Sequence, residues 1–546
     1  MRDRPDEKPV NELPPGAVEF IGRVTKRIRY RRKVRQDVQA ELTAHFEDEL
    51  RGCENAQERE QKAQRLIEGF GDAGLLGVLC RRAKKRCRPL WRKVLVRTAQ
   101  AFGVVLLYVI VCSSPLMIGR PTIRVNYIEW LNNRWRPDVA GAVNAKPLCD
   151  QAAAMYVKPP ESLQAEFDHG NAFLRSAVEW FSGYSDQEKE TLSQWLHENR
   201  PALDMLRKAS RMAHYWPAYD ASVGTLIDPT VVSDSLQVLS KYRQVVFALR
   251  EQIVWEASEG RIEDALEDCM VLRCFGRHLQ GKGFLNDQLV GASIESICYE
   301  GIALILNRVN GPEPLLARMQ QELEQHFDSG RQVVSLDGEK AFWYDNIQRR
   351  FTDDGHGGGR ALKDGIPFAA GGLGGNMLGI LWFDYPGRRE TVAMVENYFE
   401  RAQKRIDMLP NQQDADAASV ELEPGTSFLL SVTAPAHGAV GRQSWRIKIH
   451  ELATITLVAI HLYAADTGDY PATLEQVVER GYLKKLPIDP FGRGPLTYRR
   501  TGGGFLLYGW GEDFEDDGGR WGTDSRGEPR RWAHNGDWVF WPVDAQ

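Results

Sequence analysis

An uncharged and mostly apolar segment of 22 residues, Thr98–Gly119, constrains this chain more than any other feature. A helix rises 1.5 Å per residue, so about 20 apolar residues cross the roughly 30 Å hydrocarbon core of a bilayer. The segment begins almost 100 residues into the chain, which is too late for a cleavable signal peptide. We predict a single transmembrane helix over residues 97–119, and a buried helix of a soluble domain is the alternative.

Charge is unevenly distributed on the two sides of this segment. Nine basic and no acidic residues lie from Arg81 to Arg97, whereas only Arg120 and Arg124 lie close on the other side. Basic residues beside a membrane helix are retained in the cytoplasm. We therefore expect a single-pass protein of the cytoplasmic (inner) membrane, with its N-terminus in the cytoplasm and its C-terminal bulk periplasmic or otherwise extracytoplasmic. The basic run would lie on the anionic lipid bilayer, and nucleic acid is its alternative partner.

Length and composition indicate several folded domains. At about 150 residues per domain, 546 residues provide three or four domains, and 15 Trp, 17 Tyr and 21 Phe supply material for their cores. Residues 1–97 carry 24 basic and 15 acidic side chains, and residues 98–546 carry 45 and 59. The net charge of -5 argues against a nucleic-acid partner for the whole chain.

The N-terminal region combines a tail with short helices. Residues 1–17 are rich in proline and charge, which is typical of a disordered tail. Apolar residues then recur every three or four positions, and a helix over residues 58–70 is predicted to end at Gly71. The segments QAELTAHFEDEL and LIEGFGDAGLLGVL, with a Phe-Gly-Asp step, resemble the HAAS domain, a helical cytoplasmic module that precedes membrane helices in bacteria. This resemblance implies a sensing or interaction domain over residues 18–93.

The middle of the chain, residues 120–440, is predicted to be an extracytoplasmic α-rich domain. Apolar spacing predicts a helix over residues 236–259, a break at Gly260 and a second helix over residues 261–279. Cys149, Cys269, Cys274 and Cys298 would lie outside the cytoplasm, where the sequence leaves three disulfide pairings open.

Glycine-rich segments in this region are expected to be loops. The uncharged segment 365–383 contains six glycines and is interpreted as a loop or interfacial segment. The segment FTDDGHGGG, with Asp353 and Asp354, indicates either a surface turn or an oxygen-rich ion loop. The role of residues 355–379 stays open. A third apolar segment, Leu452–Ala465, is too short to span a bilayer.

The C-terminal region is predicted to combine one long helix with a pair of strands. A helix over residues 445–465 is followed by strands over residues 496–500 and 505–508, which a glycine hairpin joins. Together with Gly468, Tyr470, Pro471, Leu474, Leu483, Pro487, Asp489, Pro490 and Gly492, this pattern over roughly residues 443–541 resembles the globular domain of the major pseudopilin of type II secretion systems. It implies an α+β domain, assigned to residues 441–546, in which a long helix packs on a small antiparallel sheet.

The same resemblance implies a calcium ion that holds the loop after the last strand of the hairpin. Asp513 and Asp537 match the family's positions, and we add Asp516 and Asp517 because crowded carboxylates supply the hard oxygen ligands that calcium requires. A solvated acidic loop is the alternative. The chain departs from the family at Gly509 and over residues 520–536, and it lacks the leader and the Phe-Thr-Leu-x-Glu start of a pseudopilin.

The predicted fold class is multidomain: a helical N-terminal domain, one transmembrane helix, an α-rich middle domain and a pseudopilin-like α+β domain. The sequence contains no H-E-x-x-H, G-x-S-x-G or Gly-Lys-Ser/Thr motif. We therefore expect a non-enzymatic membrane-anchored envelope protein with an interaction, scaffold or signalling role and an envelope protein as partner. The alternatives are an extracytoplasmic hydrolase in the middle domain and an accessory subunit of a type II secretion-like apparatus.

Overall fold

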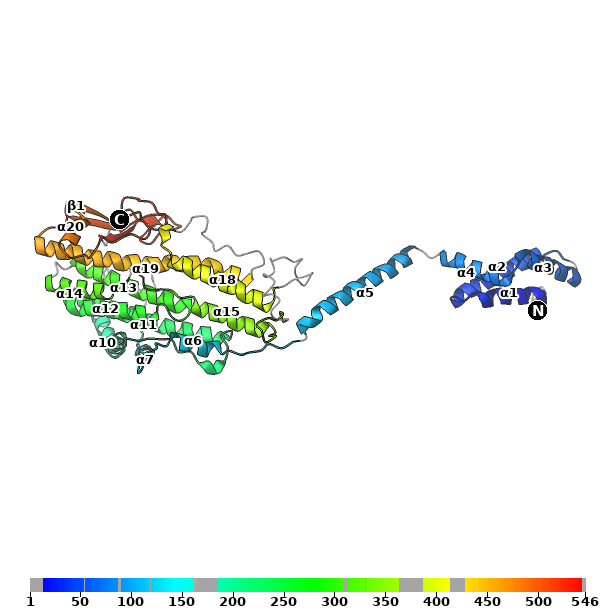
Figure 1. Cartoon of the computed structure of the whole chain (residues 1–546), viewed down its shortest axis with the longest axis horizontal. Helices are drawn as coiled ribbons and strands as arrows, with labels where there is room; N and C mark the ends of the chain where they lie inside the picture. Colours follow the sequence, from blue (N-terminus) through cyan, green and yellow to red (C-terminus); the bar gives the residue numbers. More distant parts are fainter. Residues whose placement is uncertain are drawn as a thin grey trace, which may run out of the picture. The chain divides into compact units, whose positions relative to one another are not determined.

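The computed structural model describes most of the chain, which is largely helical with a small antiparallel sheet near the C-terminus (Figure 1). The described residues are 13–53, 55–86, 90–117, 119–161, 163, 185–308, 313–328, 330–362, 386–412 and 428–542. The chain divides into two compact units, Met1–Ser113 and Ser114–Gln546. The mostly helical chain with a small C-terminal sheet agrees with the coarse part of the predicted fold class, helical regions followed by an α+β region.

Short amphipathic helices form the core of the first unit. Its helices are α1 (Pro15–Arg27), α2 (Arg32–Glu49), α3 (Ala56–Phe70) and α4 (Ala73–Arg86), and α5 (Leu90–Met117) follows them. Phe20, Phe46 and Phe70 meet in the core, with ring centroids 5.7 to 6.3 Å apart. Ala17 is fully buried in α1, so the ordered core begins inside the predicted tail. The rest of that tail, residues 1–12, lies outside the described residues.

The Phe-Gly-Asp step turns the chain from α3 into α4. Gly71 ends α3 with a φ of 74°, a left-handed conformation that glycine adopts without a Cβ clash, so the predicted helix end is confirmed. The Asp72 carboxylate then accepts a hydrogen bond from the Leu75 N–H at 2.7 Å. Further along α4, a Cβ on Gly77 would lie 2.9 Å from the Val24 carbonyl oxygen. This glycine lets α4 approach α1 closely.

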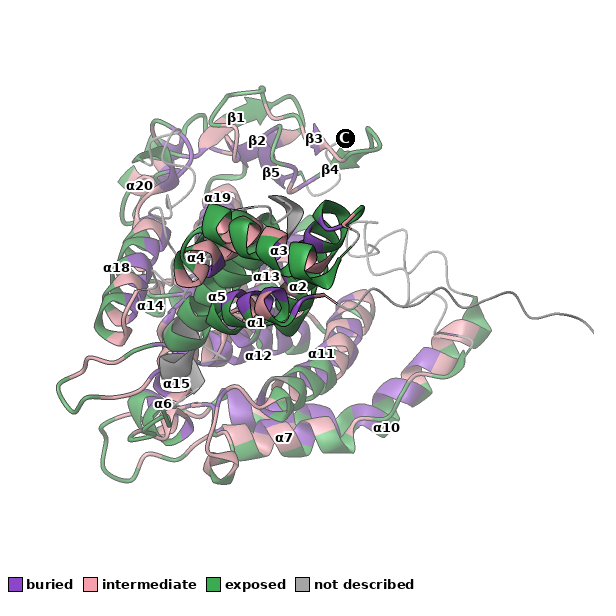
Figure 2. Cartoon of the chain, turned by 90° about the vertical axis from the view of Figure 1, so that its right-hand side faces the viewer, coloured by how far each residue is buried: buried purple, intermediate pink, exposed green. Residues whose placement is uncertain are grey.

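Three described helices are long and apolar enough to cross a membrane by length and composition. The windows are Val94–Val111 in α5, Leu285–Asn307 in α13 and Val440–Thr467 in α19. They differ in burial: 0% of the α5 window is buried, against 67% and 72% of the other two. Figure 2 colours the described residues of α5 as exposed. The sequence predicted one such helix, and it underestimated the apolar segment around Leu452–Ala465, which is part of a much longer helix. The segment 365–383 lies outside the described residues.

Helices in layers make up most of the second unit. They are α6 (Tyr127–Trp135), α7 (Lys146–Met155), α10 (Asp186–Ser210), η2 (Ala221–Val223), α11 (Pro229–Ser258), α12 (Ile262–Leu279), α13 (Leu285–Arg308), α14 (Glu313–Gln325), α15 (Asp337–Arg350), α18 (Arg388–Asp407), η4 (Pro410–Gln412), α19 (Phe428–Thr467) and α20 (Leu474–Glu479). The predicted helix pair is confirmed as α11 and α12, which Gly260 separates with a φ of 76°. α12 and α13 approach each other closely at two glycines: a Cβ on Gly276 would lie 2.6 Å from the Gly291 carbonyl oxygen.

The C-terminal sheet covers one side of α19, and α13 and α14 cover another (Figure 1). Its strands β1 (Thr497–Thr501), β2 (Gly504–Gly509) and β5 (Trp538–Trp541) pair antiparallel in the order β1-β2-β5. Thr501 pairs with Gly504 across the predicted glycine hairpin. A separate two-stranded sheet contains β3 (Gly522–Thr523) and β4 (Pro529–Arg530). Because α19 is enclosed by sheet and helices, most of its buried residues are apolar, and its buried polar residues are Ser444, His450, Glu451, Thr454 and Thr456.

One hydrophobic core runs through the second unit from Ala145 to Trp541. The boundary predicted between residues 440 and 441 falls inside α19, whose residues pack on both the helices and the sheet.

A buried ion network adds a polar connection between α19 and the helical layers. Glu451 of α19 accepts a hydrogen bond at 2.5 Å from Arg273 of α12 and pairs also with Arg277. Glu295 of α13 pairs with Arg277 at 2.7 Å and with Arg331 at 2.9 Å. Burial opposes the ionisation of Glu295, but Arg331 and Arg277 outweigh it and lower its pKa to about 2. The network therefore contains two buried carboxylates held by three guanidinium groups.

Candidate functional site

The predicted calcium ligands lie in the loop between β2 and β3 and just before β5. Asp513, Asp516 and Asp517 belong to the loop, whereas Asp537 immediately precedes β5. Among the residues that the structure describes, no group of three or more His, Cys, Asp or Glu side chains is gathered closely enough to hold a metal ion. The four aspartates are thus neighbours in one region without forming a preassembled ligand set.

Asp516 and Asp537 are held by the sheet and by the loop itself. The Tyr508 hydroxyl of β2 donates to Asp516 Oδ1 at 2.9 Å, and the Gly518 N–H donates to the same oxygen at 3.0 Å. The Gly519 N–H donates to Asp537 Oδ2 at 2.7 Å. Asp537 is fully buried, and its Oδ1 has no hydrogen-bond partner. Burial raises the pKa of Asp537 to about 7, and the charges of Asp516 and Asp517 act in the same direction.

The other acidic residues of the loop have different surroundings. Asp513 Oδ1 accepts the Glu515 N–H at 3.3 Å, and burial together with the nearby charge of Asp517 raises its pKa. Glu512 pairs with Arg442 at 3.1 Å and with Arg446 at 2.8 Å, so this carboxylate is already occupied. The orphaned buried oxygen of Asp537 fits a cation, because a buried carboxylate oxygen without a partner is costly unless an ion or donor reaches it. Asp537 is the residue of the four that fits calcium best.

The contacts of Asp489 give a structural reason for two of the residues that carry the pseudopilin resemblance, Asp489 itself and Gly492. Its carboxylate accepts the Phe491 N–H and the Trp510 N–H, both at 2.9 Å, and so joins the turn before β1 to the end of β2. A Cβ on Gly492 would lie 2.9 Å from Asp489 Oδ2, and one on Gly509 would lie 2.8 Å from Ile449 Cδ1. Glycine at position 509, where the family has serine, thus matches the close packing of the end of β2 against α19.

The segment FTDDGHGGG, the second candidate for an ion-binding loop, is a turn whose aspartates bind other groups of the protein. Asp353 pairs with Arg124 at 3.1 Å, and Asp354 Oδ1 accepts the N–H groups of His356 and Gly358 at 2.8 and 2.9 Å. These contacts agree with the surface-turn interpretation.

The predicted external cysteines are free thiols in the structure. Cys149, Cys269 and Cys298 are buried and Cys274 is half-buried, and no disulfide joins any of the four. Burial raises the pKa of Cys149 to about 12, which keeps this thiol protonated and unreactive.

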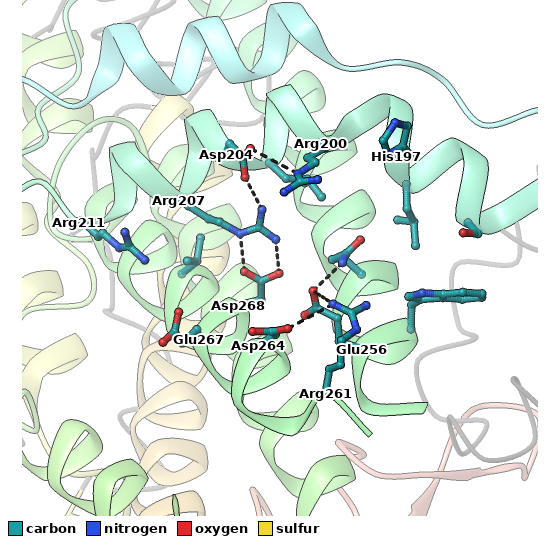
Figure 3. Close-up of a pocket in the computed structure, with 16 residues that line it drawn as sticks. His197, Arg200, Asp204, Arg207, Arg211, Glu256, Arg261, Asp264, Glu267 and Asp268 are labelled. Carbon is teal, nitrogen blue, oxygen red and sulfur yellow. Dashed lines mark hydrogen bonds and ion pairs between the residues drawn. The ribbon is translucent and has the colours of Figure 1, made fainter. Parts of the chain in front are cut away.

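A polar cleft between α10 and the α11–α12 pair is a feature that the sequence analysis missed (Figure 3). Its volume is about 430 Å³. α10 lines it with charged residues spaced three or four apart, which places them on one helix face: His197, Arg200, Asp204, Arg207 and Arg211. That spacing was the available sequence signal. The facing wall carries Glu256, Arg261, Asp264, Glu267 and Asp268.

The charges of the polar cleft are mostly paired with one another. Arg207 binds Asp268 through two hydrogen bonds of 2.7 and 2.6 Å, and Arg261 lies 3.2 Å from Glu256 and 3.3 Å from Asp264. His197 lies at one end of the cleft, away from the Arg207–Asp268 pair (Figure 3). A general base needs to reach a nucleophile or a reacting group. The described residues of the cleft do not provide such a pair, so its geometry is that of an ion-paired helix contact.

Comparisons with protein-family models, with curated proteins and with solved structures found no match to this chain. The HAAS-like and pseudopilin-like resemblances therefore stay predictions from sequence.

Proposed function

We propose that this chain is a non-enzymatic, single-pass protein of the bacterial inner membrane with an interaction, scaffold or signalling role. The observation that carries the proposal is the surface of α5, where the apolar window Val94–Val111 has a mean hydropathy of 2.1 and no buried residue. An exposed apolar surface of this size is unfavourable in water and is typical of a membrane-facing helix.

α13 and α19 belong in the folded second unit under this proposal. Glu295 and Glu451, one in each helix, are paired with arginines of the network, and ion pairs of this kind are costly in a hydrocarbon environment. Both helices also bury most of their apolar windows within the unit. α5 is therefore the helix that we propose to span the membrane. The basic residues from Arg81 to Arg97 favour a cytoplasmic location for the first unit.

Cysteine labelling of the full chain in spheroplasts tests this orientation. Ser525→Cys places a thiol in an exposed turn of the second unit, and Gln57→Cys places one on the exposed face of α3. A membrane-impermeant maleimide is expected to add label to Ser525→Cys, relative to the parent chain, in intact spheroplasts. Gln57→Cys should gain label only after permeabilisation. Labelling of Gln57→Cys in intact spheroplasts, with Ser525→Cys protected, would indicate the opposite topology.

The proposal includes calcium as a stabilising ion for the C-terminal region. Asp537 would contribute its unpartnered Oδ1, with Asp513, Asp516 and Asp517 as further oxygen donors from the loop. A divalent cation would offset the mutual repulsion of these carboxylates and the burial of Asp537.

Calcium is expected to stabilise the full chain by about 2.7 kcal/mol at a concentration 100 times its Kd, because it would bind the folded form alone. The measurement is the urea midpoint in calcium and in chelator, with limited proteolysis of residues 510–536 as a local readout. Asp537→Asn should lose the calcium effect. Glu515→Gln, a change in the same loop outside the proposed ligand set, should keep it. Coincident unfolding curves in calcium and chelator contradict the site.

A further inference from the structure

An apolar groove on the second unit lies beside α19. It includes no residue of α5, the proposed spanning helix, and none of the proposed calcium ligands. Its volume is about 580 Å³, within the range of about 300 to 1,000 Å³ that is usual for small-molecule sites. One wall is the α19 face that carries Trp445, Ile449 and Leu452, at helical spacings of four and three residues. The opposite wall is the loop 483–490.

The groove offers carbon surface on both walls. The Trp445 indole N–H donates to the Ile406 carbonyl oxygen at 3.0 Å, so the polar atom of this side chain is satisfied and its ring faces the groove as apolar surface. Ile488 on the opposite wall is 57% exposed, although a backbone bridge between Ile488 and Pro495 fixes its position. A large aliphatic side chain held open to solvent on a fixed wall is suited to an apolar ligand.

The carboxylates around the groove are already engaged. Glu451 belongs to the arginine network, and Asp489 accepts two backbone N–H groups. Glu324 pairs with Lys484 at 3.1 Å. Asp328 accepts the Gly330 N–H at 2.8 Å. It is exposed, and it is the one described acidic residue of the lining that is neither buried nor in an ion pair.

Two lysines of the groove, in contrast, have no carboxylate within ion-pair distance among the described residues. Lys448 is half-buried and lies with its ammonium 4.3 Å from the centroid of the Trp445 ring. Burial and the charge of Arg331 lower its pKa, whereas the more distant carboxylates of Asp407 and Asp328 act in the opposite direction, so the ammonium group is partly dehydrated and gains from a bound anion. Lys485 is exposed at the rim. The free charge at this apolar surface is therefore mainly positive.

We propose that the groove binds a free long-chain fatty acid, with its carboxylate at Lys448 and its acyl chain along α19 toward Ile455. Ile455 lies seven residues beyond Lys448, about 10 Å along the helix, so the apolar surface continues away from the charge. A carboxylate on an alkyl chain matches both features, since the lysine binds the head group and the groove removes the chain from water.

Photocrosslinking of the full chain in phosphatidylcholine vesicles tests this proposal. A palmitate analogue with a diazirine in its chain is expected to label residues 445–455 or 483–490, as mapped by mass spectrometry. Unlabelled dodecanoate should compete about 15-fold better than decanoate, because each buried methylene contributes about a fourfold gain. Dodecanol, which lacks the charge, should compete at least about tenfold less well than dodecanoate.

Matched lysine variants separate the head-group contact from general lipid contact. Lys448→Met retains the length and apolar character of the side chain and should abolish groove labelling, and Lys448→Arg should restore it. Lys484→Met removes the lysine that pairs with Glu324 and should label like the parent chain. An unchanged urea midpoint for Lys448→Met shows that the fold is intact. Labelling confined to α5, equal competition by dodecanol, or full labelling of Lys448→Met would each overturn the proposal.

Discussion

Replacing Glu451 by alanine is expected to lower the free energy of unfolding of the second unit by about 3 to 5 kcal/mol. Arg273 and Glu451 are each 1% exposed, and the substitution leaves the Arg273 guanidinium buried without its carboxylate. Arg277 loses one of its two carboxylates as well. The measurement is urea unfolding of the full chain in detergent, followed by tryptophan fluorescence. Fourteen of the 15 tryptophans lie in the second unit, so the signal reports almost entirely on it.

A solvent-exposed ion pair of the same unit provides the control. Arg318 and Glu267 lie 3.1 Å apart with both side chains 52% exposed, so Glu267→Ala should change the free energy of unfolding by about 0 to 1 kcal/mol. If Glu451→Ala and Glu267→Ala unfold at the same urea concentration, the buried network does not support α19 as described.

Gly276→Ala is expected to destabilise the second unit by about 2 to 3 kcal/mol, although alanine is the better helix former. The new Cβ would lie 2.6 Å from the Gly291 carbonyl oxygen and 2.7 Å from the Glu295 backbone nitrogen. Both atoms belong to the α13 backbone, so the contact is relieved only if the two helices separate. The same urea titration measures the effect.

Gly441→Ala is the matched control, because this glycine is also helical and belongs to the same unit. Its Cβ would lie 3.5 Å from the nearest atoms, which belong to Ile406 and are at ordinary van der Waals distance. The substitution should be neutral or stabilising by up to about 1 kcal/mol. A loss of stability at position 441 equal to that at position 276 would show that the glycine contact between α12 and α13 is not the cause.

Local patterns predicted many elements of this fold. The end of α3 at Gly71, the α11–α12 pair around Gly260 and the β1–β2 hairpin follow from residue spacing and glycine chemistry, which act over a few positions. α13 escaped prediction because a helix that is buried on most sides has apolar residues around its whole circumference and therefore a weak helical period. The true length of α19 was missed because Pro435 and Gly438, which disfavour a helix, lie in its first half.

The candidate sites were likewise predictable only where their residues are adjacent in sequence. The acidic loop was visible because Asp513, Asp516 and Asp517 are adjacent in sequence, yet burial of Asp537 and its unpartnered oxygen depend on the folded sheet. The contact between Arg273 and Glu451 joins residues 178 positions apart, and the lysine-lined groove combines α19 with a distant loop. Spacing along the chain carries no information about such contacts.

The position of α19 within the second unit also determines when that unit can fold during synthesis. α12 and α13 are complete by residue 308, whereas Glu451 is added more than 140 residues later. Until then Arg273 lacks its carboxylate and the apolar face of α13 lacks the helix that covers it, and incompletely covered surface of this kind favours aggregation. Nascent chains that end before α19 are therefore expected to require a holding factor or to be degraded. The last fifth of the chain completes the fold of the residues that precede it.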